Sequence, residues 1–394
     1  MNILILVRDY KSGVINEKNG MPAKSGAEIH VDRHAQAFRE QGHAVTVMAK
    51  KRRFNTPIKE IVNGIHLFRL PSGFRIWGCM YYFLNNRKKI DVIYVFGQPS
   101  FNLTAILMAY LMKIPAVFVA TMTGEAFETI KSDKYFGSIK PYRRFHNAVL
   151  KLCTAYIAIS QEIGTEFSEH GFEAGKIYVL PQGVDTRIFR PISADEKCQQ
   201  RKELGLPVGK KIVLFCSRLD LRKGIDILLA TWAEVYSKCP EAHLVVVGGG
   251  LEKHIKQLQS LRLSPIGNSV TYIGESDEPV KYFQAADIFV FPSRREGCPN
   301  VLMEAMSCGC APLVSKIGGC EDLVTEDETG KLFASEKEEE YKDKLISLLH
   351  DEAAIRRLGE NARGLCHEKL DVLYIAAKLI DLFKTCIAKE KNRS

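Results

Sequence analysis

Short apolar runs alternate along the chain with longer segments whose apolar positions recur at helical spacing. Residues 3–7 form a continuous apolar run, which is typical of a strand buried on both faces of a sheet. The pattern predicts a helix over residues 27–41 and further strands over residues 44–49, 91–96, 116–120 and 155–159. The longest apolar stretch, residues 103–120, is broken by Lys113 and Pro115. It therefore predicts a buried helix followed by a strand rather than a membrane-spanning helix.

The alternation starts again after Pro191. Strands are predicted over residues 212–216, 243–247, 270–273, 288–291 and 311–314, and helices over 225–236 and 251–261. Repeated strand–helix alternation favours parallel sheets covered by helices, so we expect an α/β fold of two Rossmann-like domains facing each other across a crevice. We place the domains at residues 1–184 and 185–371, with a C-terminal helix at about 372–394 packing back on the first. Ligands of such sheets bind beyond the carboxyl ends of the strands.

Charge is divided unevenly between the halves of this 394-residue chain. Residues 1–190 hold 26 Lys and Arg against 15 Asp and Glu, a balance of +11, and residues 191–394 hold 29 against 31, a balance of −2. Such asymmetry suggests that the first half meets an anionic partner. Nucleic acid, anionic lipid, a phosphorylated acceptor and a merely solvated basic surface are all open. The 11 cysteines lack zinc-like spacing and the N-terminus lacks a signal peptide, so we expect a cytoplasmic protein with reduced thiols.

Two cations follow the strand predicted over residues 212–216. Arg218 and Lys223 lie between this strand and the next helix, which places them at the carboxyl edge of the sheet. A guanidinium can bind a diphosphate through two hydrogen bonds, and an ammonium acts as a point charge. The segment is therefore either a diphosphate site or simply a charged loop.

Two carboxylates surround the start of a later helix. Glu296 precedes Pro299, which suits the first turn of a helix, and Glu304 lies about one turn inside it. The amides of Asn300, Val301 and Leu302 would be free to bind a phosphate. A carboxylate can hold the paired hydroxyls of a ribose. Glu304 has apolar neighbours, so an idle carboxylate there would be costly.

These residues resemble the retaining family 4 glycosyltransferases of GT-B fold. The resemblance rests on Arg218, Lys223 and the segment EGCPNVLMEAM that begins at Glu296, and covers nearly the whole chain. It implies that Arg218 and Lys223 contact the diphosphate of a nucleotide-sugar donor, Glu296 the sugar and Glu304 the ribose. Arg218, Lys223 and Glu296 would be catalytic. Further donor contacts are implied at Gly26, Gly248, Gly250, Ile273, Asn300, Val301 and Leu302.

The first half departs from the family pattern at three places. Ser25 stands where members usually carry glycine, and Gln182 where they carry asparagine. Many members have a histidine after the strand predicted over 116–120, where this chain has Thr121, Thr123 and Glu125. We expect these three, with Ser25 and Glu28, on the acceptor side. The class is thought to need no such base, because the leaving phosphate oxygen takes the acceptor proton.

No metal or other cofactor is expected at the donor site. The chain has no Asp-x-Asp, the motif with which the other nucleotide-sugar fold holds a divalent ion. His30 and His34, four residues apart on the first predicted helix, could bind a metal, but core or surface roles are favoured.

Two segments of the first half combine aromatic and basic residues. One runs from Phe74 to Lys89 and includes Trp77 and Tyr81; the other runs from Lys131 to Lys151 and includes Phe136. Such mixtures suit an anionic bilayer, although the aromatics could instead fill a core. Single-stranded nucleic acid is disfavoured by the donor motifs.

The sequence therefore predicts a metal-independent, retaining glycosyltransferase. Its partners would be a nucleoside-diphosphate sugar, a glycan or lipid-linked acceptor of polysaccharide or glycolipid biosynthesis, and the cytoplasmic membrane face. A small soluble acceptor and a non-catalytic nucleotide-sugar-binding module are the alternatives. An NAD-dependent oxidoreductase is disfavoured because no G-x-G-x-x-G follows the first strand.

Overall fold

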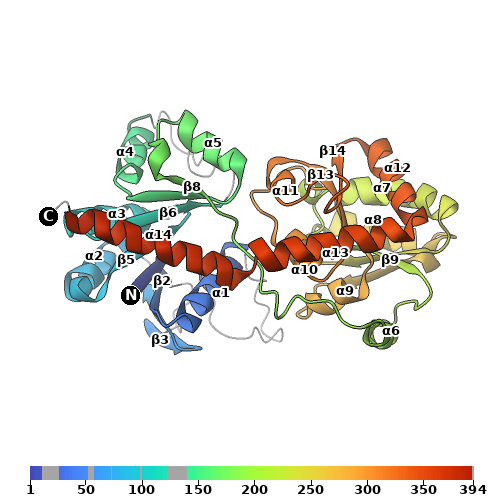
Figure 1. Ribbon diagram of the computed structural model, residues 1–394, viewed down its shortest axis with the longest axis horizontal. Helices are drawn as coiled ribbons and strands as arrows, with labels where there is room; N and C mark the ends of the chain where they lie inside the picture. The colour runs from blue at the N-terminus through green and yellow to red at the C-terminus, as the bar shows by residue number, and fades with distance from the viewer. Residues whose placement is uncertain (11–25, 52–56, 72, 98–99, 122–139, 393–394) are drawn as a thin grey trace. The chain divides into compact units, whose positions relative to one another are not determined.

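A computed structural model describes residues 1–10, 26–51, 57–71, 73–97, 100–121 and 140–392 of the chain (Figure 1). It divides into two compact units, one formed by Met1–Gln182 with Val372–Ser394 and the other by Gly183–Asp371. Each unit is an α/β domain built on its own sheet. No helix within the described ranges is long and apolar enough to cross a membrane.

The first unit contains an eight-stranded sheet in the order β3-β4-β2-β1-β5-β6-β7-β8. Only the β3–β4 pair is antiparallel. Its strands are β1 (Asn2–Leu6), β2 (Ala44–Lys50), β3 (Lys59–Val62), β4 (Ile65–Leu70), β5 (Val92–Phe96), β6 (Ala116–Ala120), β7 (Ala155–Ala158) and β8 (Ile177–Val179). Its helices are α1 (Gly26–Glu40), α2 (Arg75–Asn86), α3 (Ser100–Leu111), α4 (Lys140–Leu150), α5 (Gln161–Glu169) and α14 (Val372–Asn392), with short 3-10 turns at Arg87–Lys89 and Ala174–Lys176.

The second unit contains a six-stranded parallel sheet in the order β11-β10-β9-β12-β13-β14. Its strands are β9 (Lys211–Cys216), β10 (Ala242–Val247), β11 (Val270–Gly274), β12 (Ile288–Phe291), β13 (Ala311–Lys316) and β14 (Lys331–Ala334). Its helices are α6 (Ala194–Glu203), α7 (Ile225–Lys238), α8 (Glu252–Arg262), α9 (Pro279–Ala285), α10 (Asn300–Ser307), α11 (Gly318–Glu321), α12 (Glu338–His350) and α13 (Glu352–Lys369), with 3-10 turns at Leu221–Lys223 and Gly267–Ser269.

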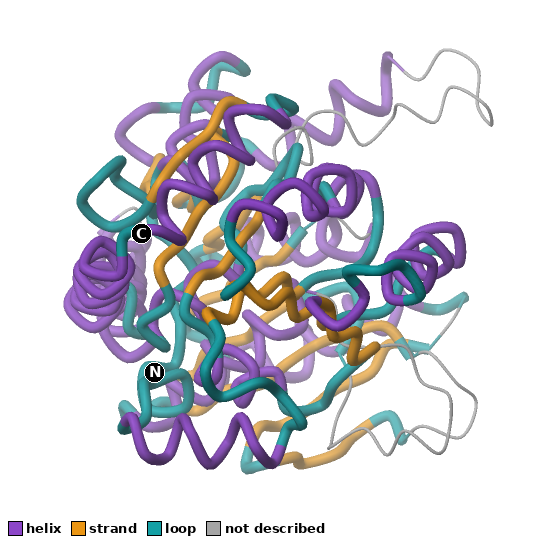
Figure 2. The backbone as a smooth tube through the Cα atoms, turned by 90° about the vertical axis from the view of Figure 1, so that its right-hand side faces the viewer, coloured by secondary structure: helices purple, strands orange, loops and turns teal. Residues whose placement is uncertain are grey.

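The central strands of both sheets are buried, as their continuous apolar runs predict. Every residue of β5, β6 and β10 is buried. Helices and strands largely alternate along the chain in both units, and Figure 2 shows the two kinds of element in separate colours. The predicted α/β class is thus confirmed, and every strand predicted above is present within one or two residues.

The C-terminal helix α14 packs inside the first unit. The centre of the Phe383 ring in α14 lies 5.7 Å from the centre of the Phe38 ring in α1 and 5.3 Å from that of the Tyr94 ring in β5. The chain therefore returns to the first unit after completing the second. It crosses from the first unit to the second between residues 182 and 183, and back between residues 371 and 372.

All eleven cysteines lie in the described part of the chain and are free thiols. Ten of them are buried, and Cys198 is half-buried.

Candidate functional site

The loops that carry the predicted donor residues gather at the carboxyl ends of β9, β10 and β12 in the second unit. Arg218 and Lys223 follow β9, Gly248 and Gly250 follow β10, and Glu296 follows β12. Because β9 pairs with both β10 and β12, these loops are neighbours at one edge of the sheet.

The Lys223 ammonium lies 2.5 Å from Oε1 of Glu296. The two side chains are only 13% and 10% exposed, so the pair is largely removed from water. The ammonium also lies 5.1 Å from the centre of the Phe291 ring. Burial lowers the pKa of Lys223, and the Glu296 carboxylate offsets part of that effect.

Further groups hold the Glu296 carboxylate in place. Ser293 donates its hydroxyl to Oε1 at 2.7 Å, and Nη1 of Arg222 reaches the same oxygen at 3.3 Å. All hydrogen bonds from described residues to this carboxylate meet at Oε1, which leaves Oε2 able to accept from a ligand hydroxyl.

Arg218 lies at the edge of the sheet, where its side chain is held by Asp220. Its guanidinium donates to Oδ2 of Asp220 at 2.7 Å, while its side chain remains 69% exposed. Oδ1 of the same carboxylate accepts from the amide of Lys223 at 3.0 Å. Burial alone would raise the pKa of Asp220, but the hydrogen bonds from Arg218 and the Lys223 amide lower it. Asp220 thus links the Arg218 side chain to the backbone of Lys223.

Arg294 fastens the loop after β12 to the loop after β9. Its guanidinium makes two hydrogen bonds to Asp226, at 2.9 and 2.8 Å, and a third to the Leu221 carbonyl. The Arg294 amide donates to the Arg222 carbonyl at 2.8 Å. Gly224 lets the loops meet, because its φ is +73° and a Cβ there would overlap the Pro292 carbonyl.

The glycines after β10 also permit a close backbone approach. Gly248 has a φ of +134°, and a Cβ there would overlap the carbonyl oxygen of Ser217; one on Gly250 would overlap that of Leu219. The Leu219 amide in turn donates to the Gly249 carbonyl at 2.8 Å. These contacts pin the Gly248–Gly250 turn against the Arg218 loop. Ile273 lies farther along the sheet, half-buried in β11.

Helix α10 brings Glu304 to the same edge. Glu304 is 6% exposed. Burial raises the pKa of Cys216, the last residue of β9, and the charge of the Glu304 carboxylate raises it further.

The start of α10 offers fewer amides than we expected. The Leu302 amide donates to the Pro299 carbonyl at 3.2 Å, because the first turn of the helix closes tightly there. The predicted ligand contacts of the Asn300, Val301 and Leu302 amides remain predictions, and that of Leu302 would compete with this bond. The side-chain Oδ1 of Asn300 is buried without a hydrogen-bond partner in the described structure.

The predicted acceptor-side residues belong to the first unit. Glu28 is buried in the first turn of α1, and Thr121 directly follows β6 and is half-buried. Gly26, predicted as a donor contact, also lies in the first unit, where it begins α1. Ser25, Thr123 and Glu125 lie outside the described residues. Near α1, the Tyr10 hydroxyl donates to Asp32 at 2.7 Å.

The two histidines of α1 have structural surroundings. His34 is 1% exposed; its Nε2 lies 2.7 Å from the Gln182 carbonyl, and its Nδ1 lies 3.4 Å from the Tyr94 hydroxyl. Burial lowers the pKa of His34 to about 4 and that of His30 well below its usual range. Both contacts of His34 tie α1 to its own unit, as the favoured core role predicts.

Sequence reasoning assigned no role to Asp220, Arg222, Ser293 or Arg294. The only signal for Asp220 was its position three residues before Lys223, where an aspartate caps a turn. The others act across loops about 70 residues apart, a relation that sequence spacing does not contain.

Each half of the chain matches a known protein family. Residues 24–188 match the family described as Glycosyltransferase Family 4, and residues 196–365 match Glycosyl transferases group 1. A D-inositol 3-phosphate glycosyltransferase of Segniliparus rotundus is 34% identical over 49% of this chain and 43% of its own length. A GDP-mannose-dependent monoacylated alpha-(1-6)-phosphatidylinositol monomannoside mannosyltransferase of Corynebacterium glutamicum is 32% identical over 48% of this chain and 50% of its own. The chain thus spans about half the length of these two relatives.

Other similarities extend over the full chain. Spore coat protein SA of Bacillus subtilis is 26% identical over 96% of this chain and 99% of its own length. Among solved structures, HepE of Anabaena in complex with UDP superposes with a TM-score of 0.77 at 20% identity, over 98% of this chain and 100% of its own. Sucrose-phosphate synthase of Thermosynechococcus elongatus superposes with a TM-score of 0.75 at 22% identity, over 98% of this chain and 99% of its own. Their fold is that of this chain.

Proposed function

Because this chain belongs to the family 4 glycosyltransferases of GT-B fold, we propose that it transfers a sugar from a nucleoside-diphosphate donor to a hydroxyl of a glycan or lipid-linked acceptor. The single observation that carries the proposal is the buried Lys223–Glu296 pair beside Arg218. It supplies cations for a diphosphate and a carboxylate for sugar hydroxyls at one edge of a parallel sheet. Burying an ion pair costs desolvation free energy, so this segment is more than a solvated charged loop.

The donor would place its diphosphate between Arg218 and Lys223, with the amides of Asn300 and Val301 as further donors. Oε2 of Glu296 would accept from a sugar hydroxyl and Glu304 from the ribose. The proteins named above support a nucleotide donor, since the HepE structure contains UDP and the Corynebacterium relative is GDP-mannose-dependent.

Transfer would proceed with retention on one face of the sugar. The bond between the anomeric carbon and the donor phosphate oxygen breaks, and the acceptor oxygen forms the new bond. The departing phosphate oxygen takes the proton of the acceptor hydroxyl. Lys223 and Arg218 would stabilise the negative charge that develops on the departing diphosphate. Electrostatic stabilisation of this kind is usually the largest single contribution to rate enhancement. No step in this scheme requires a metal ion.

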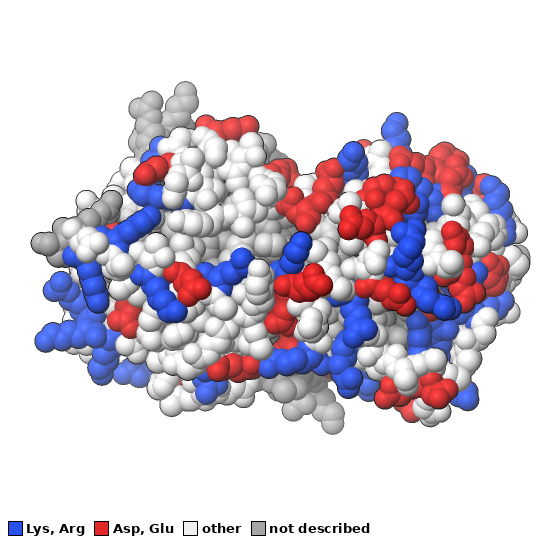
Figure 3. Space-filling view, viewed as in Figure 1, with Lys and Arg blue, Asp and Glu red and all other residues white. Residues whose placement is uncertain are grey.

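An exposed apolar and basic surface of the first unit suggests where this protein binds the membrane that carries its acceptor. The α2 stripe, formed by Phe74, Trp77, Tyr81 and Leu84, is 65–70% exposed and occupies one face of α2. The aromatics of this stripe therefore do not fill the core, whereas Phe83 of the same segment is buried in it, as the alternative to a membrane role predicts. Arg87, Lys88 and Lys89 follow the helix directly and are exposed. Lys and Arg gather at the α2 end of the face drawn in Figure 3.

An anionic bilayer satisfies both features of this surface. Apolar and aromatic side chains insert at the interface while Lys and Arg contact lipid phosphates. We propose that the first unit docks there, at the cytoplasmic membrane face, and takes a lipid-linked or membrane-proximal glycan acceptor. Two of the relatives act, by name, on inositol phosphate or phosphatidylinositol compounds, which supports an anionic acceptor.

A thermal-shift panel of UDP, GDP, ADP and their sugars tests the donor assignment. We expect one nucleoside diphosphate and its sugar to raise the unfolding midpoint, because a ligand that binds only the folded state stabilises it. The same sugar nucleotide should release its nucleoside diphosphate when an acceptor is added. Binding without turnover on any glycan, lipid-linked or soluble acceptor would favour a non-catalytic binding module. No stabilisation by any member would contradict the proposal.

A further inference from the structure

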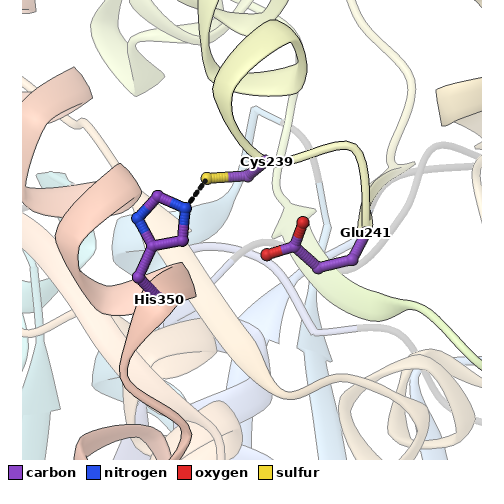
Figure 4. Close-up of side chains that lie close together, drawn as sticks. All are labelled: Cys239, Glu241 and His350. Atoms are coloured by element: carbon purple, nitrogen blue, oxygen red, sulfur yellow. Dashed lines mark hydrogen bonds between the residues drawn. The ribbon is translucent and has the colours of Figure 1, made fainter.

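Three side chains of metal-binding type converge in the second unit, away from the donor residues. Cys239 caps the end of α7, Glu241 precedes β10 and His350 is the last residue of α12. Their ligand atoms all lie within 4.8 Å of one another (Figure 4). We propose that Cys239, Glu241 and His350 form a Zn²⁺ site that joins the ends of α7 and α12.

The spacing of the nitrogen and sulfur atoms suits zinc. Cys239 Sγ and His350 Nε2 are 3.5 Å apart. Two ligands of tetrahedral Zn²⁺, with Zn–S of about 2.3 Å and Zn–N of about 2.05 Å, are separated by about 3.6 Å. The carboxylate oxygen has to move by up to about 1.3 Å to stand at ligand distance from both other atoms, because tetrahedral ligand pairs lie about 3.4–3.6 Å apart.

The charge of the three ligands balances the ion. A thiolate and a carboxylate together neutralise Zn²⁺, and the imidazole binds without charge; the thiol proton passes to solvent as the metal binds. Cysteine, histidine and carboxylate are the ligand types that zinc proteins use, and three protein ligands leave a fourth position for water. The exposure of His350 and the half-exposure of Glu241 give that water a route in.

The surrounding backbone provides a second, independent attraction for a cation. Both α7 and α12 end at the cluster, and helix C-termini carry partial negative charge. The Lys211 ammonium already occupies one of these ends, donating to the Leu349 carbonyl at 2.5 Å and lying 3.8 Å from the Glu241 carboxylate. Zinc must therefore share Glu241 with Lys211.

The turn that holds two of the ligands is rigid. The Ala242 amide donates to the Cys239 carbonyl at 3.0 Å, and the Lys211 amide donates to the Glu241 carbonyl at 2.9 Å. The backbone of Cys239 and Glu241 is thus held before a metal arrives, and the Glu241 carboxylate and the exposed His350 side chain have to adjust.

The site is separate from the proposed donor site. Glu241 lies at the start of β10 and the donor loops lie beyond the ends of the strands, so the two are at opposite edges of the sheet. The six residues of β10 span about 17 Å between those edges. Zinc here would stabilise the second unit rather than take part in transfer.

Zinc titration of the full chain after EDTA treatment and desalting tests the proposal. We expect one equivalent to bind with Kd of about 1 µM or tighter against a chromophoric chelator. Cobalt in place of zinc should show a thiolate charge-transfer band. Zinc should also raise the unfolding midpoint.

Variants identify the ligands. His350→Ala, at an exposed position that should not disturb folding, should weaken zinc about 100-fold or more and abolish the rise in unfolding midpoint. Cys239→Ser should remove the cobalt band. The matched variants Cys198→Ser and His367→Ala change a half-buried cysteine and an exposed histidine outside the cluster, and should bind zinc as the unchanged protein does.

Two results would overturn the site: no zinc binding near the micromolar range, or binding that survives His350→Ala. Nucleoside diphosphate binding, measured on the same samples, keeps the outcomes separate. His350→Ala should retain it, so failure of the zinc site does not affect the proposed function.

Discussion

Lys223 and Glu296 are 73 residues apart in the chain, yet the ammonium of one lies 2.5 Å from a carboxylate oxygen of the other. Each side chain satisfies a charge that would otherwise be buried alone. A donor that places its diphosphate near Lys223 and its sugar near Glu296 would bridge the pair. The contact therefore preorganises both groups before the donor binds.

Removing either proposed diphosphate ligand should slow transfer. We expect Arg218→Ala or Lys223→Ala to cost about 2–4 kcal/mol of transition-state stabilisation, because each removes a fixed positive charge from the departing diphosphate. Steady-state kcat/KM on a purified donor measures this. Lys238→Ala is the control, a surface lysine of the same unit paired with Glu234. Near-normal turnover in a folded double variant of Arg218 and Lys223 would contradict the assignment.

The two carboxylates should affect different ligands. Glu304→Ala should weaken the nucleoside diphosphate and the sugar donor alike, because it removes a ribose contact from both. Glu296→Ala should spare the nucleoside diphosphate and weaken mainly the sugar donor. Calorimetric titration with both ligands measures the division. Equal losses for both ligands in both variants would show that the roles are not separate.

The strands of both sheets could largely be predicted from their apolar runs, but β3 and β4 at one edge of the first sheet and the edge strands β8 and β14 could not. The hairpin β3–β4 went unpredicted although Asn63-Gly64 lies at its turn, with φ values of 50° and 72°. Asn-Gly between alternating apolar residues is a strong hairpin signal. The strands β8 and β14, of three and four residues, are too short to show a pattern.

At the candidate site, residue types were predictable and their contacts were not. Arg218, Lys223 and Glu296 stand out because polar residues follow buried strands. Ser293 shares a carboxylate oxygen with Lys223, and that relation exists only once two loops have folded together. The tight first turn at Pro299, which engages the Leu302 amide, likewise depends on backbone geometry rather than on residue type.

Transfer should continue without a divalent metal at the donor site. The proposed scheme uses Lys223 and Arg218 where another fold uses a metal ion, so turnover should survive exhaustive chelation. Initial rates are compared before and after EDTA treatment, with added Mg²⁺ or Mn²⁺. His350→Ala, treated in the same way, separates any loss of stability at the proposed zinc site. Complete loss of turnover, restored by a divalent ion, would count against the scheme.

Acid should destabilise the protein through His34. Burial lowers the pKa of this histidine to about 4 in the folded protein, whereas an unfolded chain takes up the proton near pH 6.5. The unfolded state therefore binds more protons as pH falls below 6.5. Folding should lose about 2 kcal/mol from this group between pH 7.5 and 5. His34→Gln, which keeps a hydrogen-bond donor without titrating, should show a smaller fall in unfolding midpoint over this range. An equal fall in both proteins would rule out His34 as the source.

The first unit should bind anionic bilayers through the α2 stripe and the cations that follow it. Each Lys or Arg near an anionic surface contributes roughly 1 kcal/mol, and salt screens this attraction. Co-sedimentation with phosphatidylserine-containing vesicles should therefore be strong at low salt and weak at high salt, with little binding to neutral vesicles. We expect the largest loss when five cations become Gln: Arg87, Lys88, Lys89, Arg143 and Arg144. Trp77, Tyr81 and Phe136 are the expected insertions; Phe136 lies outside the described residues.

A matched pair of variants separates docking from general charge. Arg87→Gln, Lys88→Gln and Lys89→Gln together remove three cations beside the α2 stripe, and Lys253→Gln, Lys256→Gln and Arg262→Gln remove three from α8 in the second unit. Only the first set should reduce vesicle binding. Trp77→Ser should reduce it as well, because insertion of an exposed ring adds an apolar contribution that salt does not screen. Binding indifferent to lipid charge, or equally reduced by both sets, would make the basic half a surface for a soluble anionic acceptor instead.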